Sequence, residues 1–324
     1  MRVAQGTIMV KECSQPTCFT GEMGCALGEL DRRKCPHWQG GEGTNTPVLG
    51  ADETIPFPWS GYALGLSDLS FIAGKVKPLI VAIAGPESAG KTTLLASWYL
   101  LAGRGKLLDK NVRFNGSCSL HGWEAIASSL RWTPGQPPTF PPHTTSRDAR
   151  APGLLHFSVR TGQLPSRDLL FADAPGAWFQ KWAANLNAPD AEGARWLDAH
   201  ADIILLAADR QALSGPRLGP ARNAFQLLAK RVAAQRRDRP VALVWTKGDV
   251  EVDPGMEQSI RDAVRNDIGD ALEFTTSVHS KEGDNVGLGF KELFNWVLGV
   301  RRKGAIFKQD CDHIDDPLFL FGRR

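Results

Sequence analysis

Short apolar runs alternate with amphipathic stretches along most of this chain. Four runs predict strands, at residues 79–84, 203–208, 241–245 and 272–275, and the run from Leu79 to Ala84 is typical of a strand buried on both faces of a sheet. Helical patterns cover residues 93–102, 191–199, 221–235, 256–267 and 289–302. Strands that alternate with helices predict an α/β fold with a mostly parallel sheet, whose binding loops lie at the carboxyl ends of the strands.

Two parts of the chain depart from this alternation. The runs at residues 154–159 and 168–172 are joined through Gly162 and Pro165 and predict a hairpin. Residues 104–152 are poorly periodic, with a short helix expected near residues 123–130 and a proline tract from Thr133 to Pro142 that predicts an extended, exposed loop. We therefore expect one domain at residues 78–303, with an insertion at about 104–152.

Composition narrows the class of protein. The chain has 324 residues, of which 42% are hydrophobic and 23% are charged, so it can build a full globular core. The net charge of +3 is too small to argue for a nucleic acid or an anionic membrane as a partner. We find no apolar run long enough for a membrane span, and the first residues lack the apolar core of a signal peptide. A cytoplasmic protein is expected.

Cysteines are concentrated near the N-terminus. Four of the six lie within the first 35 residues, with His37 close behind, and they are Cys13, Cys18, Cys25 and Cys35. Clustered cysteines in a compartment that disfavours disulfides indicate thiolate ligands for a structural zinc ion, with His37 as a substitute for one of them. The spacing is looser than in paired zinc knuckles, so free thiols or disulfides remain alternatives. Residues 1–50 are interpreted as this cysteine-rich leader.

Two further segments flank the predicted domain. Residues 51–77 are expected to link the leader to the domain and to pack against it. Residues 304–324 form a C-terminal tail in which four aspartates precede the apolar run from Leu318 to Phe321. The tail either packs its aromatic side chains on the domain or acts as a docking peptide for a partner protein.

One short motif carries the strongest chemical signal. The strand that ends at Ala84 is followed by Gly85-x-x-x-x-Gly90-Lys91-Thr92 and then by a helical pattern, which is the context of a phosphate-binding P-loop. Glycines let the backbone approach a polyphosphate, and the amides at the start of the helix favour an anion. Lys91 is expected to reach the β- and γ-phosphates, and the hydroxyl of Thr92 to ligate Mg²⁺. The chain is therefore expected to bind a nucleotide.

Three more motifs fall at predicted strand ends. Asp173 can hold Mg²⁺ through water, and the amide of Gly176, three residues on, can contact a γ-phosphate. Thr246-Lys247-x-Asp249 follows another strand, where an aspartate can accept hydrogen bonds from N1–H and N2–H₂ of guanine while the lysine stem lies along the base. Adenine lacks that pair of donors, so the motif selects guanine. Ser277 and Val278, after the last strand, are placed for backbone contact with guanine O6.

Together these motifs resemble the five motifs of the Ras-like P-loop GTPases, over about residues 78–302. The long insertion and the cysteine-rich leader resemble bacterial GTPases of the double-GTPase type more than a minimal small GTPase. The resemblance implies a three-layer P-loop NTPase fold with helices on both faces of the sheet. It also implies that Thr144 or Thr145 senses the γ-phosphate, with Thr145 as the preferred Mg²⁺ ligand. Residues expected to contact GTP or GDP are Gly85, Glu87, Ser88, Ala89, Gly90, Lys91, Thr92, Thr93, Thr246, Lys247, Asp249, Ser277 and Val278.

Two departures from the family pattern bear on turnover. Ala177 stands where many Ras-like proteins have the glutamine that positions water, so slow hydrolysis is expected, with Gln180, Arg147 and Arg150 as candidate substitutes. Glu87 places a carboxylate in the phosphate loop, and we expect it to face solvent or a partner. The favoured function is a slow, Mg²⁺-dependent GTP switch that an effector or activating protein reads. Alternatives are a non-hydrolysing guanine-nucleotide scaffold and a P-loop ATPase or kinase.

Overall fold

The computed structural model describes residues 37, 63–74, 77–131, 134–135, 139–141, 153–279 and 287–302. The chain divides into two compact units, residues 1–55 and residues 56–324. His37 is the one residue of the first unit that the structure describes, so everything below concerns the second unit. Several predictions lie outside the described residues, namely the zinc ligands Cys13, Cys18, Cys25 and Cys35, the threonines Thr144 and Thr145, Arg147, Arg150 and the tail at 304–324.

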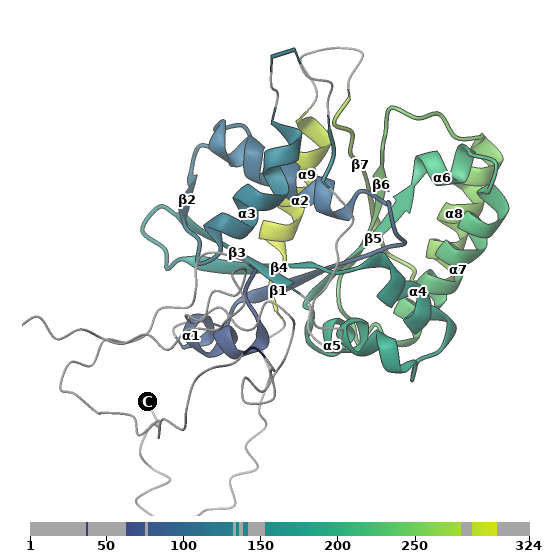
Figure 1. The fold of residues 1–324 in the computed structure, drawn as a ribbon, viewed down its shortest axis with the longest axis horizontal. Helices are drawn as coiled ribbons and strands as arrows, with labels where there is room; N and C mark the ends of the chain where they lie inside the picture. Colours follow the sequence, from purple (N-terminus) through teal and green to yellow (C-terminus); the bar gives the residue numbers. More distant parts are fainter. Residues whose placement is uncertain are drawn as a thin grey trace, which may run out of the picture. The chain divides into compact units, whose positions relative to one another are not determined.

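A seven-stranded sheet forms the centre of this unit, in the order β2-β3-β4-β1-β5-β6-β7 (Figure 1). Five strands are parallel: β4 (Arg167–Asp173), β1 (Leu79–Ala84), β5 (Ile203–Asp209), β6 (Val241–Thr246) and β7 (Leu272–Thr275). Strand β3 (Gly153–Thr161) runs antiparallel to β4, and β2 (Val112–Gly116) runs antiparallel to β3. The mostly parallel sheet and the antiparallel β3–β4 pair confirm the prediction.

Two layers of helices cover the sheet, and strand β1 shows why. Its side chains alternate between two hydrophobic clusters, because successive residues of a strand point to opposite faces. One cluster joins the sheet to α1 (Leu69–Ala73), α4 (Gly176–Ala184), α5 (Glu192–His200), α6 (Arg210–Ser214), α7 (Leu218–Ala234) and α8 (Pro254–Asp267). The other joins it to α2 (Lys91–Gly103), α3 (Leu120–Ala127) and α9 (Leu288–Gly299). This three-layer arrangement is the predicted fold.

Residues 104–131 of the insertion have more regular structure than their sequence suggests. The short helix expected near residues 123–130 is present as α3, followed by the 3₁₀ turn Ser128–Leu130. Strand β2 was not predicted, although Val112, Arg113, Phe114 and Asn115 alternate between apolar and polar side chains, because so short a run does not by itself distinguish a strand from a loop. Its loop is fixed by distant contacts with His156 of β3. The carbonyl of His156 accepts hydrogen bonds from Ser117 Oγ at 2.6 Å and Trp123 Nε1 at 2.8 Å, and its ring Nδ1 accepts one from the Cys118 amide at 2.9 Å.

Candidate nucleotide-binding site

The P-loop lies between β1 and α2, at the carboxyl edge of the sheet. Gly90 adopts a left-handed conformation, with a φ of 76°, that a side chain would strain. A Cβ on Gly85 would come within 2.9 Å of Ala207 Cβ on β5, so this glycine lets the loop pass close to the neighbouring strand. No side chain caps the start of α2 at Gly90, which leaves its first amides available to an anion.

Lys91 is folded back into the loop that precedes it. Its side chain is buried, and Nζ donates hydrogen bonds to the carbonyls of Pro86 at 2.7 Å and Gly85 at 3.2 Å. Burial lowers the pKa of Lys91 to about 8, against the opposing effect of the carboxylates of Asp173 and Glu87. A phosphate anion beside this ammonium would supply the charge that the buried position lacks.

A pair of oxygen groups lies beside the P-loop, at the end of β4. The hydroxyl of Thr92 donates a hydrogen bond of 2.9 Å to Oδ1 of Asp173. Hydroxyl and carboxylate oxygens are the ligands that Mg²⁺ prefers, alongside phosphate oxygens and water, so these residues fit that ion. Gly176 follows closely, and a Cβ on it would lie 2.2 Å from the amide nitrogen of Glu87. The segment after Asp173 therefore packs directly on the P-loop backbone.

The predicted guanine loop, residues 246–250, follows β6. Ser277 Oγ donates a hydrogen bond of 2.5 Å to Oδ1 of Asp249, and the amide of Gly248 donates one of 2.9 Å to the carbonyl of Thr276. Lys247 has a φ of 55°, and its Nζ lies 2.8 Å from Oδ2 of Asp209. The loop after β6 and the loop after β7 are therefore bonded to each other, with the carboxylate of Asp249 at their junction.

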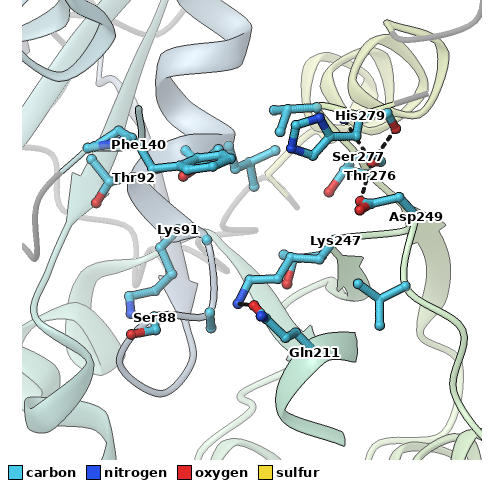
Figure 2. Close-up of a pocket in the computed structure, with 18 of the residues that line it drawn as sticks. Ser88, Lys91, Thr92, Phe140, Gln211, Lys247, Asp249, Thr276, Ser277 and His279 are labelled. Atoms are coloured by element: carbon cyan, nitrogen blue, oxygen red, sulfur yellow. Dashed lines mark hydrogen bonds between the residues drawn. The ribbon is translucent and has the colours of Figure 1, made fainter. Parts of the chain in front are cut away.

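One cavity of about 460 Å³ joins the phosphate end to the guanine end, within the range of about 300–1,000 Å³ typical of ligand pockets (Figure 2). Twelve of the thirteen predicted nucleotide contacts line it, together with Gly176, whereas Gly85 and Asp173 are not among the lining residues. Lining residues that were not predicted are Leu94, Phe140, Pro141, Gln211, Val250, Thr276, His279 and Phe290. Motifs that are separate in the sequence thus share one space.

Two of the unpredicted residues meet across the cavity. The rings of Phe140, from the insertion, and His279, from the loop after β7, contact each other edge to face, with centroids 6.0 Å apart (Figure 2). A phenyl ring at this position offers an apolar surface to a base. Gln211 follows β5, and its Oε1 accepts a hydrogen bond of 3.0 Å from Lys247 Nζ. The rule that binding loops follow strand ends could have identified Gln211, whereas no sequence signal distinguished Phe140.

The comparison with protein families decides the identity of this domain. A model described as "Double-GTPase 2" matches residues 79–297, a range that includes the P-loop, the Asp173 motif and the guanine loop. The chain belongs to the double-GTPase 2 family. Membership supports GTP binding and GTPase function in the broad sense, and it agrees with a P-loop fold.

Other comparisons add less to the double-GTPase 2 assignment. No curated protein matches the chain. A solved structure, titled as the crystal structure of ttk003000868 from Thermus thermophilus, is 18% identical in sequence and has a TM-score of 0.27. The match covers 59% of this chain and 22% of that chain.

Gln180 and Glu87, two residues expected to bear on GTP hydrolysis, are exposed, whereas Lys91 of the P-loop is buried. Gln180 is exposed on α4 and does not line the cavity. Glu87 is exposed, although it also borders the cavity. The segment after Gly176 is the helix α4, and it is held by buried side chains at Trp178, Phe179 and Trp182. Neither Ala177 nor Gln180 therefore presents a polar group to the phosphate end of the cavity.

Proposed function

We propose that this double-GTPase 2 protein binds GTP with Mg²⁺, hydrolyses it slowly, and presents its nucleotide state to a partner protein. The observation that carries the proposal is the single cavity in which the P-loop and the Asp249 loop face each other. A P-loop alone would suit ATP equally well, but a carboxylate at the base end accepts the N1–H and N2–H₂ donors of guanine. A single guanine nucleotide can then place its phosphates at the P-loop and its base at Asp249.

In this proposal each end of the cavity has a separate task. The amides of the P-loop and Lys91 hold the β- and γ-phosphates, while Thr92 and Asp173 hold the Mg²⁺, with Thr145 as the expected third protein group. The ion supplies charge neutralisation between the β- and γ-phosphates when it is bound. Asp249 reads guanine, Lys247 lies along the base, and the backbone at Ser277 and Val278 faces O6. Attack by water on the γ-phosphate yields GDP and phosphate.

Slow hydrolysis is expected from the residues that follow Gly176 in the described part of the chain. The methyl group of Ala177 cannot orient a water molecule, and Gln180 is exposed outside the cavity. Because α4 is anchored in the core, we expect the γ-phosphate to act mainly on the loop that carries Thr144 and Thr145. These same features favour the second candidate, a guanine-nucleotide scaffold that does not turn over. The chain's proposed organisation is a leader at 1–50, a linking segment at 51–77, the GTPase domain at 78–303 and a tail at 304–324.

One experiment distinguishes the GTP switch, the non-hydrolysing scaffold and an ATPase or kinase. The purified full chain, with Mg²⁺, is mixed with labelled GTP, and both displacement by ATP and single-turnover formation of GDP are measured, with Lys91→Ala as the inactive control. Slow GDP formation that ATP does not suppress supports the switch. Binding of GTP without GDP formation supports the scaffold. Equal competition by ATP refutes the guanine assignment and leaves an ATPase or kinase.

The predicted zinc site is a separate question, since its cysteines lie outside the described residues. Among the described residues no group of three or more His, Cys, Asp or Glu side chains could hold a metal ion. Within the same residues no helix is long and apolar enough to cross a membrane. Elemental analysis of the full chain, compared with a chain that begins at residue 56, tests the prediction of one zinc ion in the leader.

A further inference from the structure

Three consecutive residues at the junction of β5 and α6 all bind the guanine loop. Asp209, the last residue of β5, forms an ion pair with Lys247 at 2.8 Å, and Gln211 accepts a second hydrogen bond from the same ammonium. Between them, Nε of Arg210 donates a hydrogen bond of 2.7 Å to the carbonyl of Val250. We call Asp209, Arg210 and Gln211 the β5–α6 clamp. Lys247 and Gln211 lie side by side below the base end of the cavity (Figure 2).

Arg210 makes more contacts than its single bond to the loop. Its guanidinium forms an ion pair of 2.6 Å with Glu257 of α8, and it lies 5.6 Å from the ring centre of Trp245. Trp245 is fully buried and directly precedes the guanine loop. Both Arg210 and Glu257 are themselves largely buried, at 14% and 17% exposure, so solvent screens this ion pair less than one at the surface. The contacts with Glu257 and Trp245 therefore hold the guanidinium in place for its hydrogen bond to Val250.

A second arginine contacts the ring of Trp245. Arg261 lies 5.6 Å from the same ring and pairs with Glu257 at 3.0 Å and with Glu273 at 2.8 Å. Trp245 Nε1 in turn donates a hydrogen bond of 2.7 Å to Glu273. Trp245, near the end of β6, thus contacts two guanidinium groups that share the carboxylate of Glu257, directly before the guanine loop.

The Val250 carbonyl belongs to the residue next to Asp249, so its position sets the direction of the Asp249 side chain. On its other side Asp249 is held by Ser277, and the neighbouring Gly248 amide by Thr276. A carboxylate that accepts two parallel hydrogen bonds from a base tolerates little displacement, because misplacement by about 1 Å removes most of the benefit of preorganised contacts. Loss of the Arg210 contact leaves Val250 with the hydrogen bond of 3.0 Å from its own amide to the carbonyl of Lys247.

We infer that Arg210 is a positioning residue for guanine recognition, which holds Val250 and thereby aims the Asp249 carboxylate at the exocyclic amine of the base. Asp209 and Gln211 position Lys247 in the same clamp. This inference rests on the proposed function, in which Asp249 binds guanine. Asp209 is a poor probe of it, because its carboxylate also accepts the amide hydrogen bonds of Gln211 and Ala212 at the start of α6. Arg210 is a better probe, because its side chain contacts the loop while the N-cap of α6 is Asp209.

The test compares GTP with ITP, whose hypoxanthine base lacks the exocyclic amine, in the full chain with Mg²⁺. Dissociation constants for GTP, ITP and ATP are measured for the wild type, Arg210→Met and Arg210→Lys. We expect Arg210→Met to weaken GTP by about tenfold, equivalent to one well-made hydrogen bond, and to weaken ITP less, because hypoxanthine keeps N1–H but has no exocyclic donor to lose. The preference for GTP over ITP then falls toward one. Arg210→Lys keeps a donor and the charge opposite Glu257, so an intermediate preference is expected.

Arg239→Met is the matched control. Arg239 forms a similarly buried ion pair with Asp198 of α5 at 2.7 Å, and neither residue lines the cavity. We expect this variant to lower the melting temperature without changing the ratio of GTP to ITP affinity. A merely structural role for Arg210 would give the same pattern as Arg239, and that outcome would overturn the inference.

The two proposals can fail separately. If the wild type binds ATP as tightly as GTP, the proposed guanine site is wrong. If the wild type prefers GTP over both ATP and ITP, but Arg210→Met and Arg210→Lys keep the wild-type preference for GTP over ITP, the positioning role of Arg210 is wrong and the guanine site stands. Should Arg210→Met fail to fold, the milder Arg210→Lys decides the question alone.

Discussion

Nucleotide affinity should depend on pH through Lys91. Burial lowers the pKa of this lysine from 10.5 to about 8, so the charged form is disfavoured by roughly 3 kcal/mol relative to water. The phosphates of a bound nucleotide favour the charged form and raise the pKa again. Above pH 8 binding must therefore take up a proton, and from pH 7 to pH 9 the dissociation constant should rise about tenfold.

The assay has two independent readings. GTP affinity is measured at half-unit steps from pH 7 to pH 9, and calorimetry at pH 9 in buffers of different ionisation enthalpy counts the protons taken up, about 0.9 per nucleotide for a pKa near 8. Lys91→Arg is the control, because a guanidinium does not titrate in this range and any remaining slope reports ionisation of the base. A flat affinity in the wild type with no proton uptake would refute the reasoning.

The lowered pKa of Lys91 also affects stability: nucleotide affinity falls as the pH rises, whereas the free energy of unfolding increases. Since the folded-state pKa lies below the unfolded value of 10.5, the unfolded chain binds more protons between about pH 8 and pH 10.5. This lysine therefore makes the free energy of unfolding of the nucleotide-free protein rise with pH across that window. Chemical denaturation at pH 8 and pH 10, compared between the wild type and Lys91→Met, isolates its contribution. A contribution that falls with pH would contradict the assigned pKa.

Three further predictions concern single positions. Asp249→Asn should weaken GTP by about a hundredfold and improve binding of XTP, whose O2 carbonyl accepts the new amide donor; competition assays check this, and unchanged GTP affinity would refute the role of Asp249. Thr92→Ala should abolish the stimulation of GTP binding by Mg²⁺ while leaving metal-free binding nearly intact, which titration with and without chelator would reveal. Gly176→Ala should lower the melting temperature and disturb GTP binding together, since its Cβ would lie 2.2 Å from the Glu87 amide; a neutral effect would show that the P-loop yields easily.

The sequence predicted those elements whose pattern lies within a few neighbouring residues, such as an apolar run or a motif of fixed spacing. Strand β1 is apolar throughout, and β5 and β6 are buried at every residue, so burial on both faces was readable from the runs themselves. The P-loop and the Asp249 loop were readable because their chemistry needs particular residues at fixed spacing after a strand. Helix α4 was overlooked, although its apolar residues at 178, 179, 182 and 183 follow a helical period.

Contacts between distant segments could not be predicted in this way. The alternation in strand β2 is only four residues long, and the loop that follows it is placed by bonds with His156, about 40 residues further along the chain. The approach of Phe140 to His279 joins positions about 140 residues apart, and nothing in either neighbourhood indicates it. Arg210 resembles any surface arginine in the sequence. Its importance arises only when β5 and β6 are paired side by side and Val250 comes within reach.

The packing of α4 bears on how turnover is controlled. Trp178 lies directly on the backbone of α5, since a Cβ on Gly193 would come within 2.1 Å of its ring, and Gly176 is equally close to the P-loop. A helix fixed at both points cannot swing a side chain toward the γ-phosphate without breaking core contacts. Helix α4 therefore does not supply the group that orients the attacking water. If, as proposed, a partner protein reads the GTP state, that partner is a natural source of this group.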